Sequence, residues 1–214
     1  MFNKYIAFLK ERFKEKLPGE EAHLSMAPLG RKPLNYYLSL NIDYRNGSVL
    51  SHFYPIDNQP HLLFIQRSED GKTHSGQIAF PGGTQDTIDA DLQQTALREA
   101  YEEVGLKQSE VNIIGQLSNL YIPVSKFMVQ PYVSYGNSIP EFKLSADEVQ
   151  QVLPLKVSEL ANPSIIKAKR IRTFNGILND VPCYEIAGVT IWGATAMMLA
   201  ELLYISKGFD FTVD

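Results

Sequence analysis

Three glutamates within five residues are the feature of this sequence most suited to chemistry. Glu99, Glu102 and Glu103 lie in the run Arg98-Glu99-Ala100-Tyr101-Glu102-Glu103-Val104. An α-helix advances about 100° per residue, so these carboxylates project within an arc of roughly 100°. Neighbouring carboxylates repel by about 1 to 4 kcal/mol per pair at 4 Å unless a cation lies among them. The spacing predicts a site for Mg²⁺ or Mn²⁺, which bridge carboxylates to phosphates; a solvated acidic helix face is the alternative.

Two glycines upstream predict a loop that accompanies this helix. Gly82 and Gly83 follow Phe80 and Pro81, and their lack of a Cβ atom lets backbone approach a metal ion or a phosphate closely. An ordinary tight turn is the alternative. Gly105 stands where the helix needs its C-terminal stop. The face opposite the glutamates is predicted to be core and consists of Leu97, Ala100, Tyr101 and Val104.

The loop and the helix together resemble the signature of the Nudix hydrolases. That signature is a glycine, five residues, a glutamate, seven residues, then Arg-Glu, an aliphatic residue, any residue, Glu-Glu, any residue, a glycine and an aliphatic residue. Counting from Gly83 leads to Asp89 where the family has glutamate, and eight residues rather than seven separate Asp89 from Arg98. The helical half matches closely, with Ala100 at the aliphatic position.

These departures resemble one branch of the family, the coenzyme A diphosphatases. That branch has Gly-Gly-x-x-Asp-x-x-Asp followed by Thr-Ala-Leu-Arg-Glu-Ala, as this chain has in 82–89 and 95–100. Its upstream motif is matched by Leu62-Leu63 and Arg67-Ser68, followed at the branch's spacings by Lys72, Gly76 and Phe80. Ile65 replaces the branch's threonine and Lys72 its second arginine. A lysine keeps the charge but loses the bidentate fork that arginine offers a phosphate.

The resemblance implies roles for the residues of the loop and the helix. Glu99 and Glu103 are the leading metal ligands, Glu102 is a third, and the backbone carbonyl of Gly82 is an addition from the loop. The implied cofactor is Mg²⁺ or Mn²⁺. Arg98 is expected to brace the loop, and so to preorganise the ligands, by pairing with Asp89 or Asp86.

The general base and the substrate contacts follow from the same resemblance. The base is either Glu102 or Glu148, and a solvated turn is the alternative for Glu148. The expected substrate contacts are Arg67, Lys72, Gly83 and His74, although a structural or surface role for His74 is an alternative. A basic cluster, a candidate for binding a 3′-phosphate or else a solvated charge run, consists of Lys167, Lys169, Arg170 and Arg172.

The implied reaction is metal-dependent hydrolysis of coenzyme A or acyl-coenzyme A to 3′-phospho-AMP and (acyl-)4′-phosphopantetheine. Two alternatives stay open. One is a Nudix hydrolase of another nucleoside diphosphate derivative: ADP-ribose, a dinucleotide or an oxidised nucleotide. The other is a Nudix-fold ligand sensor without catalysis, against which the intact glutamates speak.

Composition predicts an ordinary globular protein. The chain has 214 residues, 44% of them hydrophobic, which is enough for one full core. A net charge of −4 gives no basic footprint for nucleic acid. Cys183 is the single cysteine, so no intrachain disulfide forms, and it is expected to be an inert thiol in a reducing cytoplasm. We expect no secretion signal, membrane span or membrane partner.

The order of elements predicts an α/β protein: a Nudix-type α/β/α sandwich with a mixed sheet. Residues 1–40 are expected to form an N-terminal amphipathic helix and an irregular connection, and 41–214 the Nudix domain, in one globular unit. The oligomeric state is open, with a homodimer as one option. Helices are expected at 92–104 and 193–207, and an acidic turn or helix at 146–152. Strands are expected at 36–42, 48–54, 61–67, 77–80, 111–117, 129–135, 171–174 and 181–186.

Overall fold

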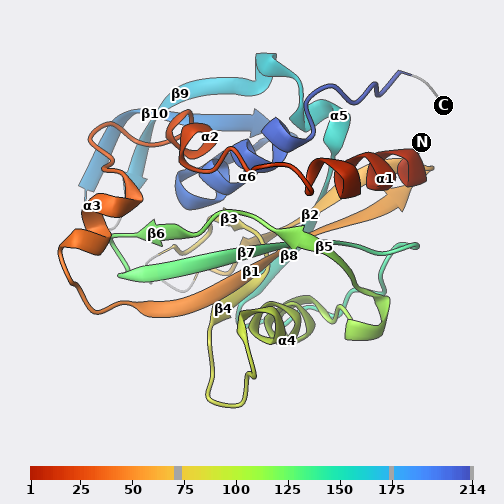
Figure 1. The fold of residues 1–214 in the computed structure, drawn as a ribbon, viewed down its shortest axis with the longest axis horizontal. Coiled ribbons are helices and arrows are strands. Elements are labelled where there is room, and N and C mark those ends of the chain that lie inside the picture. Colours follow the sequence, from red (N-terminus) through yellow and green to blue (C-terminus); the bar gives the residue numbers. More distant parts are fainter. Residues whose placement is uncertain (70–73, 174–175, 213–214) are drawn as a thin grey trace.

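A mixed sheet forms the centre of the protein (Figure 1). Within residues 1–69, 74–173 and 176–212, which the computed structural model describes, this sheet has eight strands. Strand β1 (Arg45–Ile56) runs antiparallel to β2 (Gln59–Arg67) and β4 (Gly82–Thr84) and parallel to β7 (Phe127–Tyr135). The other strands pair with β2 or β7: β3 (Ile78–Ala79), β5 (Asn112–Gln116), β6 (Leu120–Ile122) and β8 (Val149–Lys156). Because β4 carries both glycines of the loop, the central strand holds that loop.

Helices cover both faces of this sheet. Helix α4 (Leu92–Val104) packs on one face, and α1 (Phe2–Arg12), α2 (Glu20–Leu24) and α6 (Gly193–Ile205) lie on the other (Figure 1). The pattern of each helix explains its place, because α1 and α4 are amphipathic whereas α6 is apolar almost all round and is buried. The remaining helical segments are short: α3 (Leu34–Ser39), α5 (Val157–Leu160), η1 (Gln108–Glu110) and η2 (Pro163–Ile165).

A second, antiparallel sheet lies beyond α6. Its strands in the described residues are β9 (Ile166–Thr173), β10 (Gly176–Ile186) and β11 (Val189–Trp192), with β10 in the middle. Side chains of α6 and of both sheets join the larger of two hydrophobic cores, which also includes the buried face of α1. The smaller core lies between the central sheet and α4. Each fully buried large apolar side chain there contributes about 1.5 to 3 kcal/mol, so α4 is fixed against the sheet that carries its loop.

The predicted fold class is confirmed, and so are the amphipathic N-terminal helix and the C-terminal helix. The predicted helix at 92–104 coincides with α4. Within the described part of the chain, no helix is long and apolar enough to cross a membrane. The strand predicted at 171–174 falls on β9, but Phe174 lies outside the described residues.

Three predictions of local structure differ from the observed elements. The strand expected at 36–42 is helix α3, which begins directly after Pro33, a residue whose fixed φ suits a helix start. The acidic turn or helix expected at 146–152 is a turn only up to Glu148, because Val149 begins β8, which pairs with β2. The connection predicted to be irregular at 18–33 contains α2. For α2 and β8, partners distant in the sequence decided the local structure: α2 packs on α6, and β8 pairs with β2.

Candidate active site

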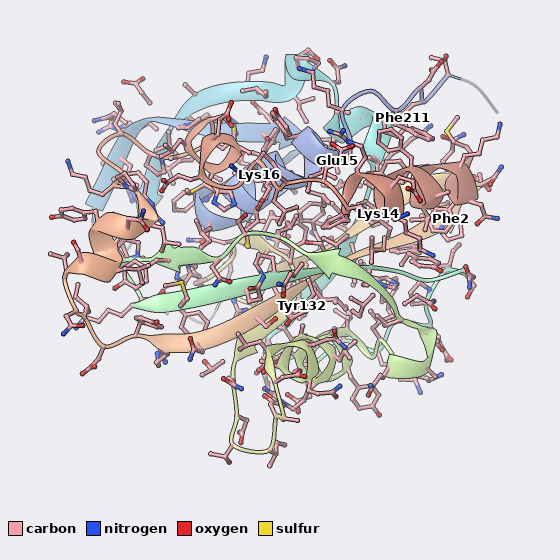
Figure 2. All side chains as sticks on the ribbon, in the orientation of Figure 1. Phe2, Lys14, Glu15, Lys16, Tyr132 and Phe211 are labelled. Carbon is pink, nitrogen blue, oxygen red and sulfur yellow. The ribbon has the colours of Figure 1, made fainter. Side chains whose placement is uncertain are left out.

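Both ends of α4 are capped, which fixes the direction in which its glutamates point. Asp91 accepts a hydrogen bond from the Gln94 amide at 2.8 Å at the N-terminus. Gly105 takes a left-handed conformation with φ of 74° at the C-terminus, and its amide bonds to the Tyr101 carbonyl at 2.8 Å. Tyr132 of β7 lies between the sheet and α4 (Figure 2). These contacts make the helix a rigid support for the site.

Glu103 is the most buried carboxylate of the site, with only 2% of its side chain exposed. Its Oε2 accepts the Gly82 amide at 2.9 Å, and its Oε1 lies 3.3 Å from Nη1 of Arg67. Burial raises the pKa of Glu103 to about 7, although the Gly82 amide and Arg67 oppose the shift; the charges of Glu99 and Glu148 add to it. The structure therefore joins helix, glycine loop and β2 at this one carboxylate.

Glu99 lies one helical turn earlier and contacts the second loop glycine. A Cβ atom added at Gly83 would lie 2.6 Å from the carboxylate carbon and both oxygens of Glu99. The Glu99 carboxylate also pairs with Nη1 of Arg98 at 2.9 Å. Burial raises the pKa of Glu99 above its ordinary value despite Arg98, and the charges of Glu102 and Glu148 raise it further. The absence of a side chain at Gly83 is thus what leaves room for this carboxylate.

Arg98 connects the helix to the loop that follows β4. Its Nε and Nη2 donate to the two carboxylate oxygens of Asp89, each at 2.9 Å, and Nη2 also donates to the Thr84 carbonyl at 3.0 Å. Asp89 accepts two more hydrogen bonds, from the Asp86 amide and the Thr95 hydroxyl, both at 2.9 Å. The hydrogen bonds from Arg98 are the main reason that the pKa of Asp89 falls to about 2. Arg98 therefore pairs with Asp89, one of its two expected partners.

Asp86 and Glu102 have more exposed positions than Asp89 and Glu103. Asp86 makes no ion pair with Arg98; its carboxylate accepts the Thr87 hydroxyl at 3.0 Å and the Ile88 amide at 3.3 Å. Glu102 is 52% exposed and accepts Nη1 of Arg98 at 2.8 Å. The prediction that Tyr101 belongs to the core is wrong, because this residue is 59% exposed. The helix turns its core face to the sheet through Ala100 and Val104 instead.

The other predicted site residues lie in different settings. Glu148 is exposed, in the turn before β8, yet close enough for its charge to act on Glu99 and Glu103. His74 bonds through Nδ1 to the Gln77 side chain at 3.0 Å, with a φ of 73°. Arg67 reaches Glu103, as described above. Lys72 lies outside the described residues.

The basic cluster predicted from the sequence does not share one surface. Its four residues all lie on β9, where successive side chains point to opposite faces of the sheet. Lys167 and Lys169 therefore share one face and Arg170 and Arg172 the other. Lys169 also pairs with Glu185 at 2.8 Å. The four side chains therefore do not form a single phosphate site, because the strand directs them to two faces of the sheet.

The donor atoms around Glu99 and Glu103 are suited to a hard divalent cation. Both side chains supply oxygen, both have raised pKa values, and the Glu99 carboxylate lies so close to Gly83 that a Cβ atom there would clash with it. No three acidic, histidine or cysteine side chains among the described residues are gathered closely enough to hold an ion by themselves. Mg²⁺ commonly binds through one or two carboxylates, with water and substrate phosphates completing its shell. The pair of glutamates fits that requirement, whereas a closed three-glutamate site does not form.

Two contacts of the site were not predicted from the sequence. Gly82 was expected to contribute its carbonyl, but its amide is what holds Glu103. Thr95 was noticed only as part of a motif, yet its hydroxyl holds Asp89. The six-residue spacing between Asp89 and Thr95 indicates this hydrogen bond only once the loop geometry is known.

Buried Glu103 and partly buried Glu99 on one helix, facing a glycine loop, are suited to metal-assisted hydrolysis of phosphoric anhydrides, and the comparisons with known proteins agree with that class. The chain matches the NUDIX domain over residues 49–163. It is 32% identical over 162 residues to the peroxisomal coenzyme A diphosphatase NUDT7 of Mus musculus, covering 72% of this chain and 68% of that protein. This chain belongs to the Nudix hydrolase family. Nudix enzymes act on small nucleotide-derived substrates and generally require divalent metal ions such as Mg²⁺ or Mn²⁺.

Two further similarities concern a second relative and a solved structure. The chain is 40% identical over 100 residues to an uncharacterized Nudix hydrolase, NudL, of Pectobacterium atrosepticum, covering 47% of this chain and 52% of that relative. The match therefore spans about half the length of that relative. The MutT protein of Methanosarcina mazei Go1 has a solved structure with a TM-score of 0.48 and 19% identity, covering 75% of this chain and 93% of that one.

Proposed function

We propose that this Nudix hydrolase cleaves the diphosphate of coenzyme A or acyl-coenzyme A, giving 3′-phospho-AMP and (acyl-)4′-phosphopantetheine. The observation that carries the proposal is the arrangement around Asp89. Asp89 and Thr95 belong to the motif that resembles the coenzyme A branch, and the structure joins them to each other and to Arg98. The relative from mouse, itself named a coenzyme A diphosphatase, supports the same substrate.

We propose that Glu99 and Glu103 hold the divalent metal, with Glu102 and the backbone of Gly82 as additional contacts. A bound Mg²⁺ or Mn²⁺ neutralises charge on the diphosphate oxygens and lowers the pKa of a coordinated water. The protein places its carboxylates on a capped helix, so their separation is fixed before substrate binds. Gly83 leaves the face of Glu99 free of side-chain bulk.

Arg98 acts as a positioning residue in this proposal. It lies within 2.9 Å of Glu99, Glu102 and Asp89, so it fixes the helix glutamates and the loop in one network. The pair with Asp89 is largely buried, with 19% of the Arg98 side chain and 3% of the Asp89 side chain exposed. Arg98 is therefore expected to fix the geometry of the ligands in addition to stabilising the loop.

The general base is proposed to be Glu102 or Glu148. Both are exposed to solvent, and either carboxylate can accept a proton from the attacking water. Arg67 and the glycine loop are proposed to contact the substrate phosphates, because Arg67 reaches from β2 to the same carboxylate as Gly82. His74 and Lys72 are proposed as further contacts from the segment that precedes β3.

The test is a substrate panel run with purified protein and Mg²⁺ or Mn²⁺. Coenzyme A, acetyl-coenzyme A, ADP-ribose, a diadenosine polyphosphate and an oxidised nucleoside triphosphate are compared by kcat/KM, with products separated by chromatography and identified by mass. We expect the highest kcat/KM for coenzyme A or its acyl ester, and only the two products named above. Intact coenzyme A, with efficient cleavage of another member of the panel, would overturn the substrate assignment.

The variant Glu103→Gln tests the metal assignment separately. It removes one negative charge but keeps an oxygen that can accept the Gly82 amide, so folding is expected to persist while kcat/KM falls by more than about 100-fold. Glu141→Gln is the matched control, because Glu141 is exposed and lies outside the site. Unchanged activity in the Glu103 variant would contradict the role of that carboxylate.

A further inference from the structure

A pocket of about 200 Å³ lies between α2, α6 and β6, on the side of the central sheet away from α4 (Figure 1). The lining comes from α2 and the residue before it, from the connection between α2 and α3, from the start of α3, from β6 and its approach, and from α6. No lining residue comes from the glycine loop or from α4. The pocket is therefore separate from the site proposed to cleave the diphosphate.

A buried polar network fixes the inner end of this pocket. Glu201 of α6 is fully buried and its carboxylate pairs with Nε2 of His23 at 2.8 Å. It also accepts the Ser118 hydroxyl at 2.7 Å and the Gly19 amide at 3.1 Å. Burial alone would raise the pKa of Glu201, but the hydrogen bonds from His23 and Ser118 bring it below its ordinary value. His23 and Ser118 line the pocket, so its inner surface is rigid and polar before any ligand arrives.

Two cations line the pocket without ion-pair partners. Within the part of the chain that the structure describes, neither Arg31 nor Lys32 has a carboxylate oxygen within 4.0 Å. Arg31 is half-buried; it donates to the Tyr121 carbonyl, and its guanidinium lies 5.1 Å from the centre of the Tyr37 ring. Its position is therefore fixed while its charge is only partly hydrated.

Among the described lining residues, the one carboxylate is that of Glu20, and it is already engaged. It accepts the Leu34 amide at 2.6 Å, and its charge acts on Arg31 from a distance. Burial lowers the pKa of Arg31, so the surroundings penalise its charge more than they compensate it. An anion bound beside Arg31 and Lys32 would offset that penalty, since a guanidinium forms strong paired hydrogen bonds with phosphate or carboxylate.

Much of the rest of the lining is apolar, although Asn35 and Asn119 also belong to it. Leu24, Leu34, Leu120 and Met197 contribute side chains, together with Tyr121. A ligand that fills the pocket must therefore combine an anionic group for the cations with a small uncharged body for these side chains. Inorganic phosphate alone would leave the apolar part unfilled.

We propose that this pocket binds a small phosphate monoester with an apolar body, at a site separate from the diphosphate site. A phosphate dianion matches two unpaired cations, whereas a carboxylate carries charge for only one of them. The proposal concerns binding, so it stands or falls independently of which diphosphate the enzyme cleaves.

The test uses phenyl phosphate as probe and the full chain without added metal, in EDTA, so that the carboxylate site cannot recruit the phosphate through a cation. Binding is measured by calorimetry and by amide chemical shifts. We expect saturable binding that shifts the amides of 31–35 and 118–121, and that weakens about 10-fold or more in Arg31→Gln and about 3-fold in Lys32→Ala. Lys207→Ala is the matched control because Lys207 is exposed beyond the end of α6. Its affinity should equal that of the wild type.

Three results would overturn the proposal. Unchanged affinity in Arg31→Gln would remove the cation assignment. Equal affinity for benzoate would remove the preference for a phosphate. Shifts confined to the amides of 82–83 would place the probe at the diphosphate site. If Arg31→Gln does not fold, Arg31→Lys and Lys32→Ala answer the same question. Arg31→Lys keeps a side chain of similar reach, and Lys32→Ala alters only an exposed residue.

Discussion

Replacing Gly83 with alanine should damage the active site while leaving the fold intact. The added Cβ atom would lie 2.6 Å from the carbon and both oxygens of the Glu99 carboxylate. The three nearest heavy atoms all belong to the Glu99 side chain, so the closest clash is with a side chain rather than with backbone. Glu99 is the end of a flexible side chain on α4, and it can withdraw by rotating about its side-chain bonds. The perturbation is therefore directed at one proposed metal ligand.

The geometry sets the size of the effect. Carbon atoms in favourable contact lie about 3.5 to 4.0 Å apart, so the Glu99 carboxylate must withdraw by roughly 1 Å. A displacement of that size in a catalytic constellation can lower the rate by about 100-fold, which corresponds to about 2.7 kcal/mol of transition-state stabilisation. The free energy of unfolding should change by less than about 1 kcal/mol, because alanine restricts the unfolded chain and offsets part of the crowding.

Gly82→Ala is the matched comparison. Its Cβ atom would lie 2.3 Å from the Ser48 carbonyl oxygen and 2.6 Å from Cα of Val49, both of which are backbone, and Gly82 has a φ of 156°. Strand pairing must shift there, so we expect a loss of about 1 to 3 kcal/mol in the free energy of unfolding.

Urea unfolding and kcat/KM with coenzyme A, or with the best substrate of the panel, separate the two variants. Full activity in a folded Gly83→Ala protein would refute the argument that Gly83 exists to admit Glu99. So would a loss of activity that merely follows a loss of stability.

Two further predictions address the bracing of the loop and the acid sensitivity of the fold. Arg98→Lys keeps the charge but loses the fork to Asp89, so kcat/KM should fall by about 10- to 100-fold and the Asp86 amide should exchange hydrogen faster; wild-type values of both would contradict the bracing role. His52 is buried with its Nε2 unpartnered among the described residues, and burial lowers its pKa from 6.5 to about 3. The folded state then binds fewer protons, so its free energy of unfolding should fall by up to about 1.4 kcal/mol per pH unit as the pH drops from 6.5 towards 3. Urea titrations should show a shallower decline in His52→Gln, and equal slopes would exclude His52 as the cause.

The sequence predicted the elements whose patterns are local and strong. Helix α4 has an acidic face, an aspartate cap and a terminal glycine, and its predicted bounds coincide with those observed. Helix α3 was misjudged because its tyrosines and leucines are typical of strands, while nothing in the segment reveals that it would lack a pairing strand. The start of β8 was missed for the opposite reason: its pairing with β2 joins residues about 85 positions apart.

The candidate site was predictable in its residue types but not in how their charges are shared. Spacing placed three glutamates on one helical face, yet Glu103 is buried against the loop while Glu102 is half exposed and turned to Arg98. That difference depends on which part of the face meets β2 and β4, and helical periodicity carries no such information. The network around Glu201 and His23 joins α6 to the segment after α1, so no local pattern announces it.

The two departures from the general Nudix signature are physically linked in this structure. An aspartate carries its carboxylate one methylene closer to the backbone than a glutamate does, so the loop itself must pass nearer to Arg98 for the two to pair. The eighth residue between Asp89 and Arg98 supplies chain length for that approach. Asp91, which caps the start of α4, lies in this segment. The closer backbone also brings the Asp86 amide and the Thr95 hydroxyl onto the same carboxylate, so that Asp89 receives four hydrogen bonds. We infer that the substitution and the insertion compensate each other, and that reverting either alone should loosen the loop more than reverting both.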